Sequence, residues 1–320
     1  MKKYLTAFLT VASFVVGASG QTVTPADDSR WGLVDISVAC VRAKPSHASE
    51  QTTQALCGTP VKVGRRSGDW YEVELPDGYR GQINRANVTL LSESRMSQWR
   101  RSRRVIVTVP GTTDVLADTL AGAGGRRVAE LVEGAVVEAL SDGGRYVRVG
   151  LPGGRAEGYV EKRSVADFEK WASVAPDASV ILSTASAMVG SPYVWGGLTS
   201  KGPDCSGLVK AAYWQSGLIL RRDASQQALT GQDVSIANPT EWAAADLLFF
   251  AGSDGVRITH VAIHIDGGRY IHSSGRVGYG SIHPGDADYV GRKVVKVRRI
   301  LGSEMTPGIT PVKNHKWYFE

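Results

Sequence analysis

The sequence has few sulfur-containing residues and few Phe. Its 320 residues include three Cys, four Met and six Phe, against 37 Gly. After the first twenty residues, no stretch approaches the roughly 20 consecutive apolar residues that a membrane helix needs, so we expect no stable membrane insertion. So many glycines beside so few Phe and Met residues favour a turn-rich chain with many short strands over a helical bundle.

Strong charge of one sign is also missing. The 37 Lys and Arg stand against 31 Asp and Glu, and nucleic-acid binding needs a concentrated basic stripe. The best candidate is one short run from Arg95 to Arg104, which we interpret as a solvated linker segment or as a site of attraction to an anionic cell wall. We expect no nucleic-acid partner.

The first twenty residues have the pattern of a secretory signal peptide. Lys2 and Lys3 precede an apolar run from Tyr4 to Val16, and small residues follow at 17–20. We therefore expect an exported protein, periplasmic or extracellular, whose mature chain starts near Gln21. Loss of the two lysines lowers the formal net charge from +6 to +4.

An odd number of cysteines in an exported chain leaves at least one unpaired. Cys40 and Cys57 flank a hairpin-like stretch, and folding it about its middle places them opposite each other. A disulfide and two buried free thiols are both compatible with this pattern. Cys205 is the remaining thiol.

Two segments, 71–81 and 147–158, resemble each other weakly. Each has an alternating strand, a Pro- and Gly-containing turn and a second strand, as hairpins do. A duplicated small β-barrel accounts for both, and we place the copies at 30–92 and 104–166, with the Arg-rich run between them.

The pattern changes from about Val180. Helical spacing covers 179–189 and 206–216, and four strand-like segments follow at 247–250, 259–265, 270–272 and 294–300. Helices first and sheet second predict an α+β domain, which we place at 180–302. The final stretch, 303–320, is rich in Pro and polar residues, and we interpret it as a loose tail.

Cys205 lies where a thiol becomes reactive. Asp204 stands directly before a helical run and is a natural N-cap, so Cys205 falls in the first turn. The positive end of the helix dipole and unpaired backbone donors favour a thiolate and predict a lowered pKa for this thiol.

Two histidines on consecutive predicted strands offer a base and its orienting partner. Val261, Ile263 and Ile271 alternate with them and face a core, which leaves His260 and His272 on the other face. A plain two-residue Gly267-Gly268 hairpin would split the histidines between faces. A three-residue or bulged turn pairs 262 with 272 and puts both on one face, as a Cys–His–orienter arrangement requires.

Plainer interpretations remain open at this point. Free cysteines are mostly small buried hydrophobes, and a lone strand His is mostly structural. Zinc fits less well, because no Cys-x-x-Cys or helical His-x-x-x-His pair is present. We expect no metal and no cofactor.

Five ordered motifs resemble those of the NlpC-type cell-wall cysteine peptidases. They are YVWGG at 193–197, GPDCSGL at 202–208, DLLFF at 246–250, THVAI at 259–263 and IHSSG at 271–275. The resemblance covers about 180–302, and the upstream barrels resemble the bacterial SH3 domains that are fused to such enzymes. One departure is Ala244-Ala245, where the family usually has Pro-Gly.

The resemblance implies a papain-like fold and hydrolysis of peptidoglycan stem peptides by a monomer. Cys205 would be the nucleophile that forms a thioester, His260 the base and later acid, and His272 the residue that orients His260. It also implies that Tyr193 walls the site and helps to bind the oxyanion beside the Cys205 amide. Asp204 and Ser206 would contact polar groups of the substrate, with helix capping as the plainer role.

A narrower resemblance is to SH3-fused γ-D-glutamyl-L-diamino acid endopeptidases, through RDASQQ at 222–227, PSHASE at 45–50 and DGY at 77–79. It implies that Glu50, Tyr79 and Asp223 close around a free N-terminal L-Ala, since an amide-capped stem would leave these groups unpaired. Arg222 or Ser225 would bind the α-carboxylate of γ-D-Glu. Two rivals are a binding protein with an inactive Cys domain and an amidase or acyltransferase on the same fold.

Overall fold

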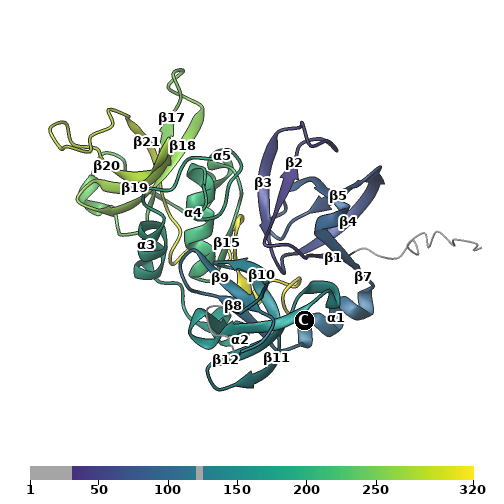
Figure 1. The fold of residues 1–320 in the computed structure, drawn as a ribbon. Helices are drawn as coiled ribbons and strands as arrows, with labels where there is room; N and C mark the ends of the chain where they lie inside the picture. Colours follow the sequence, from purple (N-terminus) through teal and green to yellow (C-terminus); the bar gives the residue numbers. More distant parts are fainter. Residues whose placement is uncertain (1–30, 120–124) are drawn as a thin grey trace, which may run out of the picture.

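The computed structural model describes residues 31–119 and 125–320, so the predicted signal peptide lies outside the described residues. Three bodies follow one another along the chain (Figure 1): two strand-rich bodies, then a mixed body of helices and strands. The predicted fold class is therefore confirmed. No helix of the described part is long and apolar enough to cross a membrane.

The first body is a seven-stranded antiparallel sheet with the order β3-β2-β6-β5-β4-β1-β7. Its strands are β1 (Trp31–Val34), β2 (Val38–Arg42), β3 (Gln51–Leu56), β4 (Pro60–Ser67), β5 (Trp70–Glu74), β6 (Arg80–Asn84) and β7 (Val88–Leu91). Alternate residues such as Val41, Val73 and Ile83 are buried and form its core, because successive side chains of a strand point to opposite faces.

The second body repeats this topology. Its order is β10-β9-β13-β12-β11-β8-β14, which is the first order with seven added to each number. The strands are β8 (Arg104–Val107), β9 (Thr112–Leu116), β10 (Arg127–Val132), β11 (Val136–Gly143), β12 (Tyr146–Gly150), β13 (Glu157–Glu161) and β14 (Val165–Asp167). Identical topology supports the predicted duplication. The predicted limits 30–92 and 104–166 stay our proposal for the domain boundaries.

The Arg-rich segment is not the solvated linker that we predicted. Helix α1 (Glu93–Arg101) forms there, capped by Ser92, and it buries Met96 and Trp99. Arg104 is also buried: its guanidinium lies 4.5 Å from the Trp99 ring centroid and donates to the Tyr318 carbonyl at 2.8 Å. The segment is helical because Met96 and Trp99, which lie between the arginines, share one face of a helix and are buried there.

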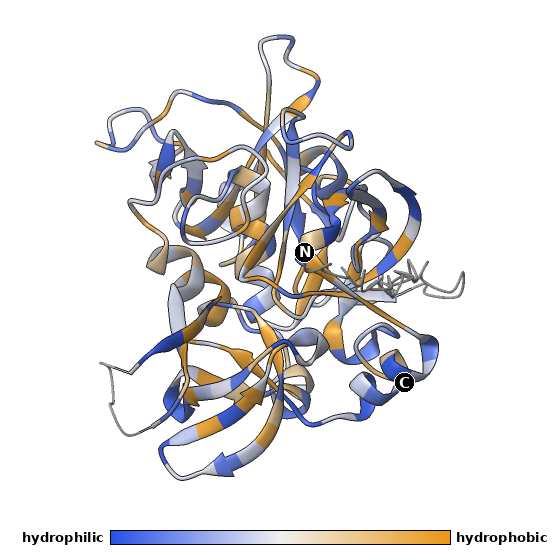
Figure 2. Ribbon diagram, turned by 45° about the vertical axis from the view of Figure 1, so that its right-hand side comes forward, coloured by the Kyte–Doolittle hydropathy of each residue, from blue (hydrophilic) through white to orange (hydrophobic). Residues whose placement is uncertain are grey.

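The third body packs helices on one face of a six-stranded sheet (Figures 1 and 2). The sheet order is β16-β21-β17-β18-β19-β20. The helices are α2 (Phe168–Ser173), which leads in from the second body, then α3 (Ala178–Ala187), α4 (Cys205–Gln215) and α5 (Ala224–Gln227). The strands are β15 (Leu218–Leu220), β16 (Gln232–Val234), β17 (Leu247–Ala251), β18 (Ile258–Asp266), β19 (Arg269–Ser274), β20 (Arg276–Ser281), β21 (Val294–Arg299) and β22 (Ile309–Pro311).

The last residues are ordered against the rest of the protein, so the predicted loose tail is wrong. Strand β22 pairs with β15, and Val312 and Tyr318 are buried. The ring of Trp317 meets Trp31 of the first body at 5.3 Å, and Phe319 stacks on Phe168 at 5.4 Å. The aromatic residues near the C-terminus outweigh the local Pro-rich, polar composition, because each buries a large apolar area.

Candidate active site

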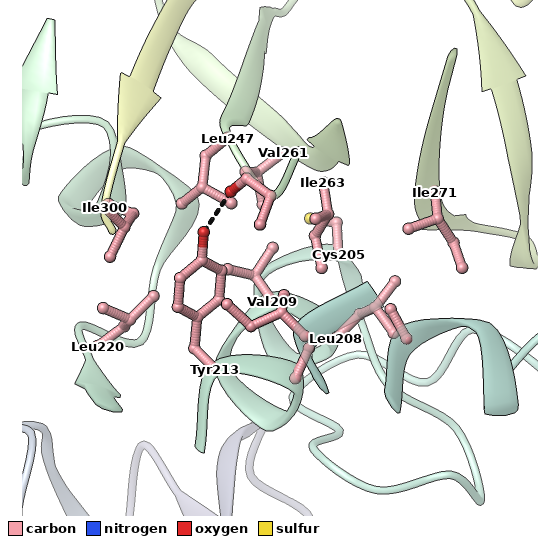
Figure 3. Close-up of a cluster of buried hydrophobic side chains, with 14 of the residues drawn as sticks. Cys205, Leu208, Val209, Tyr213, Leu220, Leu247, Val261, Ile263, Ile271 and Ile300 are labelled. Atoms are coloured by element: carbon pink, nitrogen blue, oxygen red, sulfur yellow. Dashed lines mark hydrogen bonds between the residues drawn. The ribbon is translucent and has the colours of Figure 1, made fainter. Parts of the chain in front are cut away.

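Cys205 opens α4 and faces the sheet. Asp204 is the N-cap, and its carboxylate accepts the Gly207 N–H at 2.7 Å. Figure 3 shows the Cys205 side chain directed toward Val261 and Ile263 of β18. The thiol is 7% exposed and belongs to the apolar core between α4 and the sheet. The predicted position in the first helical turn is confirmed.

The two predicted histidines share one face of the sheet. Strands β18 and β19 pair Ile263 with Ile271 and His264 with Tyr270, and this register puts 262 opposite 272, as predicted. The turn is the bulged alternative: Asp266 pairs with Arg269 around Gly267-Gly268, and a bulge at Ile265 restores the register. The ring atoms His260 Nε2 and His272 Nδ1 lie 2.9 Å apart.

The thiol lies where β18 and β19 part. Their register ends at Ile263–Ile271, so His260 and Ser273 lie beyond the last pair. The backbone amide of Val261 donates toward the Cys205 sulfur, and Ser273 Oγ donates to the Pro203 carbonyl at 2.7 Å. The start of α4 is therefore held against both strands, next to the residue that follows His260.

Burial keeps both histidines neutral. It lowers the pKa of His260 to about 3, with further lowering by the charges of His272 and Arg292. Burial and Arg292 lower the pKa of His272 to about 4. Since a buried imidazolium loses its hydration, the neutral form is favoured.

The pKa of Cys205 is raised, whereas the helix start predicts a lowered one. Burial is the largest cause and the Asp204 carboxylate the next, and together they outweigh the backbone donors of Val261 and Ser206. At neutral pH the Cys205 thiol and the two imidazoles are therefore all uncharged at rest. The core that positions this sulfur also removes the water that would stabilise its anion.

Arg222 donates hydrogen bonds to the side chains of Asp204 and Ser206. It is 1% exposed, and its nitrogens donate to Asp204 Oδ2 at 2.5 Å, Ser206 Oγ at 2.8 Å and, in the first body, Thr53 Oγ1 at 2.8 Å. Each of these groups is buried and already bonded. The structure thus shows Arg222, Asp204 and Ser206 bonded to one another, which agrees with the plainer capping role of Asp204, and their contacts with substrate stay a prediction. Ser225 is exposed at the start of α5.

The residues expected around a substrate amine are only partly brought together. Tyr79 of the first body lies within electrostatic reach of Asp223 of the third body, since burial and then Asp223 raise the Tyr79 pKa. Burial also raises the pKa of Asp223. Glu50 instead accepts the indole N–H of Trp195 at 2.7 Å. Sequence reasoning did not assign Trp195 a role, although it lies inside the YVWGG motif.

Tyr193 lies within electrostatic reach of the Cys205 thiol. Its pKa is raised to about 12 by burial and then by Cys205 and Asp204, so its hydroxyl keeps its proton at neutral pH. The Tyr193 amide donates to the Gly275 carbonyl at 2.9 Å, which ties the loop before α4 to the β19–β20 turn. The hydroxyl is thus available as a hydrogen-bond donor near Cys205.

Cys40 and Cys57 are free thiols in the structure. Cys40 pairs with Gln54, and Leu56 pairs with Val38, so the hairpin register places Cys57 beyond the end of β2. Cys57 then packs into the core of the second body. The predicted hairpin is present, but it does not place the two sulfurs opposite each other, and no disulfide forms.

Two segments of the chain match known protein families. Residues 190–299 match the NlpC/P60 family, and residues 41–87 match the bacterial dipeptidyl-peptidase Sh3 domain. The chain carries an NlpC/P60 domain behind a bacterial dipeptidyl-peptidase SH3 domain. Cys205, His260 and His272 all lie inside the matched NlpC/P60 residues.

Two relatives of known name resemble most of the chain. The chain is 28% identical over 230 residues to the γ-D-glutamyl-L-lysine dipeptidyl-peptidase of Bacillus subtilis (strain 168), which covers 69% of this chain and 71% of the relative. It is 28% identical over 238 residues to the protein of the same name in Bacillus cereus (strain ATCC 10987 / NRS 248), covering 71% and 68%.

Solved structures share the fold. An NlpC/P60 family protein from Bacillus cereus ATCC 10987 superposes with a TM-score of 0.69 at 23% identity, covering 85% of this chain and 99% of the other. An NlpC/P60 endopeptidase from Photobacterium damselae subsp. piscicida gives 0.61 at 16% identity, covering 91% and 75%.

One departure of the NlpC/P60 domain has a structural cost. Ala245, where the family usually has Gly, has a φ of 66°, a left-handed conformation that glycine adopts more readily. The Tyr213 hydroxyl donates to the Ala245 carbonyl, the bond drawn in Figure 3. Core packing around Tyr213 holds this turn in place of the missing glycine.

Proposed function

We propose that the protein is a cysteine endopeptidase that cleaves the bond between γ-D-Glu and an L-diamino acid in peptidoglycan stem peptides with a free N-terminal L-Ala. The observation that carries the proposal is the 2.9 Å contact between His260 Nε2 and His272 Nδ1 on strands packed against the helix start that bears Cys205. The names of the Bacillus relatives support the substrate class.

In this mechanism the resting dyad is neutral. His260 donates its Nε2–H to His272 Nδ1, which leaves Nδ1 of His260 as the acceptor for the Cys205 proton. The proton moves to His260 as the sulfur attacks the γ-carbonyl carbon, so the negative charge develops on the carbonyl oxygen and no free thiolate forms in the buried site. A raised thiol pKa and lowered imidazole pKa values fit this order of events.

The tetrahedral oxyanion then needs donors. The backbone N–H of Cys205 is one of the unpaired donors of a helix start, and the Tyr193 hydroxyl, protonated at neutral pH, is the second. His260 passes its proton to the departing amine and a thioester to Cys205 remains. Water, deprotonated by His260, attacks the thioester carbonyl and releases the γ-carboxylate and the thiol.

The first SH3 body selects the substrate end. At its boundary with the NlpC/P60 domain, Tyr79 lies within electrostatic reach of Asp223, and Glu50 accepts a hydrogen bond from Trp195. An ammonium group balances these carboxylates, whereas an N-acetylated stem leaves them desolvated and unpaired.

The test uses two matched tripeptides, L-Ala-γ-D-Glu-diamino acid with a free amine and its N-acetylated form, with products followed by mass spectrometry. Cleavage of the free peptide alone is expected. Cleavage of both at equal rates would keep the peptidase and discard the amine pocket. Cleavage of neither would favour a cell-wall peptide-binding protein, and release of an amide or an acyl-transfer product would favour the amidase or acyltransferase.

A further inference from the structure

Arg292 lies within electrostatic reach of His260 and His272, and no ion pair is found for it among the described residues. It precedes β21, whose Val294 lies opposite Phe250, and Phe250 in turn lies opposite His260. Directly opposed residues share a face, so Val294, Phe250 and His260 form one row across the sheet. Arg292 stands two residues before this row, on the segment that enters it.

The charge of Arg292 reaches three side chains of the site. It adds to the lowering of the pKa of His260 and of His272, and it opposes the rise that burial gives to the pKa of Tyr270, whose ring centroid lies 5.2 Å from that of His272. Arg292 is exposed to solvent, and it has no ion-pair partner in the part of the chain that the structure describes.

The two acids of the segment between β20 and β21 have other partners. Asp288 lies 3.4 Å from the guanidinium of Arg269, and Asp286 accepts the Ser281 hydroxyl at 2.6 Å. Nothing in this loop therefore neutralises Arg292. An unpaired arginine next to two neutral histidines fits a negatively charged ligand group.

The two ends of the site also carry opposite charges. The acids proposed to bind an amine, Glu50 and Asp223, lie at the boundary between the first SH3 body and the NlpC/P60 domain, whereas the segment that joins β20 to β21 lies on the side away from the first body (Figure 1). Arg292 and Lys293 belong to that segment and are exposed. This polarity matches a peptide with its amine at one end and carboxylate beyond the cleaved bond.

We propose that Arg292 binds a carboxylate of the leaving diamino acid and thereby favours substrates that carry one. This inference rests on the proposed function. The carboxylate has two sources, the main-chain carboxyl of a C-terminal diamino acid or a side-chain carboxyl of the diaminopimelate type. When the carboxylate pairs with Arg292, it also offsets the cation that disfavours a proton on His260, so that binding and proton transfer are coupled.

The test compares four tripeptides with the stem L-Ala-γ-D-Glu: L-Lys as free acid, L-Lys as carboxamide, diaminopimelate as free acid, and diaminopimelate with only its main-chain carboxyl amidated. The variants are Arg292→Gln, Arg292→Lys and, as a matched control, Lys293→Gln. We expect Arg292→Gln to raise KM roughly 10- to 100-fold for peptides with the recognised carboxylate and to leave the L-Lys carboxamide unchanged.

The pattern across the four peptides identifies the carboxylate. A loss on both free acids but not on the main-chain amides assigns the main-chain carboxyl, and a loss on both diaminopimelate peptides assigns the side chain. Arg292→Lys should recover part of the affinity, and Lys293→Gln should behave as wild type. Equal KM values of the wild-type protein for all four peptides, or an equal rise for all with Arg292→Gln, would overturn the inference while keeping the peptidase. Cleavage of none would overturn both.

A second readout separates binding from mere structural support. Loss of the Arg292 cation should move the acidic limb of kcat/KM to higher pH, because His260 then holds a proton more readily. A structural role would lower the rate at every pH without moving the limb. An unmoved limb in Arg292→Gln would contradict the placement of this guanidinium beside His260.

Discussion

Arg222 of the NlpC/P60 domain donates to Thr53 of the first SH3 body at 2.8 Å, across 169 residues of sequence. The same guanidinium also donates hydrogen bonds to Asp204 and Ser206, the residues on either side of Cys205 in the sequence. One buried cation therefore joins the first body to the helix start that holds the thiol. Because every one of these groups is buried, the network tolerates no missing member.

Loss of that cation should be costly. Arg222→Gln leaves the Asp204 carboxylate buried without its charge partner, and we expect the free energy of unfolding to fall by about 3–5 kcal/mol. Urea unfolding measures the change. The matched control is Arg221→Gln, an exposed neighbour that reaches the Asp77 carbonyl of the same body and should change stability by less than about 0.5 kcal/mol. Equal stability of the two variants would contradict the network.

His272 acts through His260, so its replacement should affect kcat more than KM. His272→Ala removes the acceptor that lies 2.9 Å from His260 Nε2, and we expect kcat to fall roughly 10- to 100-fold, the value of one hydrogen bond to a group that becomes charged. His272→Asn offers a carbonyl acceptor and should recover part of the rate. Steady-state kinetics on the free-amine tripeptide decide this, and an unchanged kcat in His272→Ala would remove the orienting role.

The buried histidine pair makes stability depend on pH. Their folded pKa values, about 3 and about 4, lie below the unfolded value of about 6.5. Between these limits the unfolded chain binds more protons, so stability is full above about pH 6.5 and falls as the pH drops toward 3. Each histidine contributes a slope of up to about 1.4 kcal/mol per pH unit.

Urea unfolding at pH 7 and pH 5 measures this effect. The His260→Gln and His272→Gln double variant is the control, since it lacks both titrating groups and should show a shallower loss. The same pH dependence in wild type and double variant would mean that other groups are responsible.

Alkylation of Cys205 distinguishes a neutral pair from an ion pair. Its thiol pKa is raised above the ordinary value of 9.0, so the rate of reaction with iodoacetamide should keep rising from pH 7 to pH 9. Peptide mapping separates Cys205 from Cys40 and Cys57. A rate that levels off below pH 8 would show a thiolate already formed and would contradict the neutral resting state.

Local patterns in the sequence were enough to predict the elements that bear the site. Asp204 before an apolar helical run predicts the position of Cys205, and alternation around His260 and His272, with a bulged Gly turn, predicts that they share a face. Each of these features depends on residues close in the sequence, where capping and strand alternation act.

The rest depends on contacts between distant residues. The residues next to Arg222 in the sequence do not predict that it bonds to Thr53 of the first body. Likewise, the aromatic residues near the C-terminus contact Trp31 and Phe168 only in the folded chain. The Cys205 pKa was mispredicted for the same reason: the helix start is a local feature, whereas the burial that outweighs it comes from the sheet.

The central claim is tested most directly by the products that wild type and Cys205→Ala release from L-Ala-γ-D-Glu-diamino acid in water enriched in ¹⁸O, analysed by mass spectrometry. The account predicts that wild type releases the free diamino acid and an L-Ala-γ-D-Glu dipeptide with one ¹⁸O in its γ-carboxyl, and that the variant releases neither. Cleavage after L-Ala, or the same products from Cys205→Ala, would contradict it.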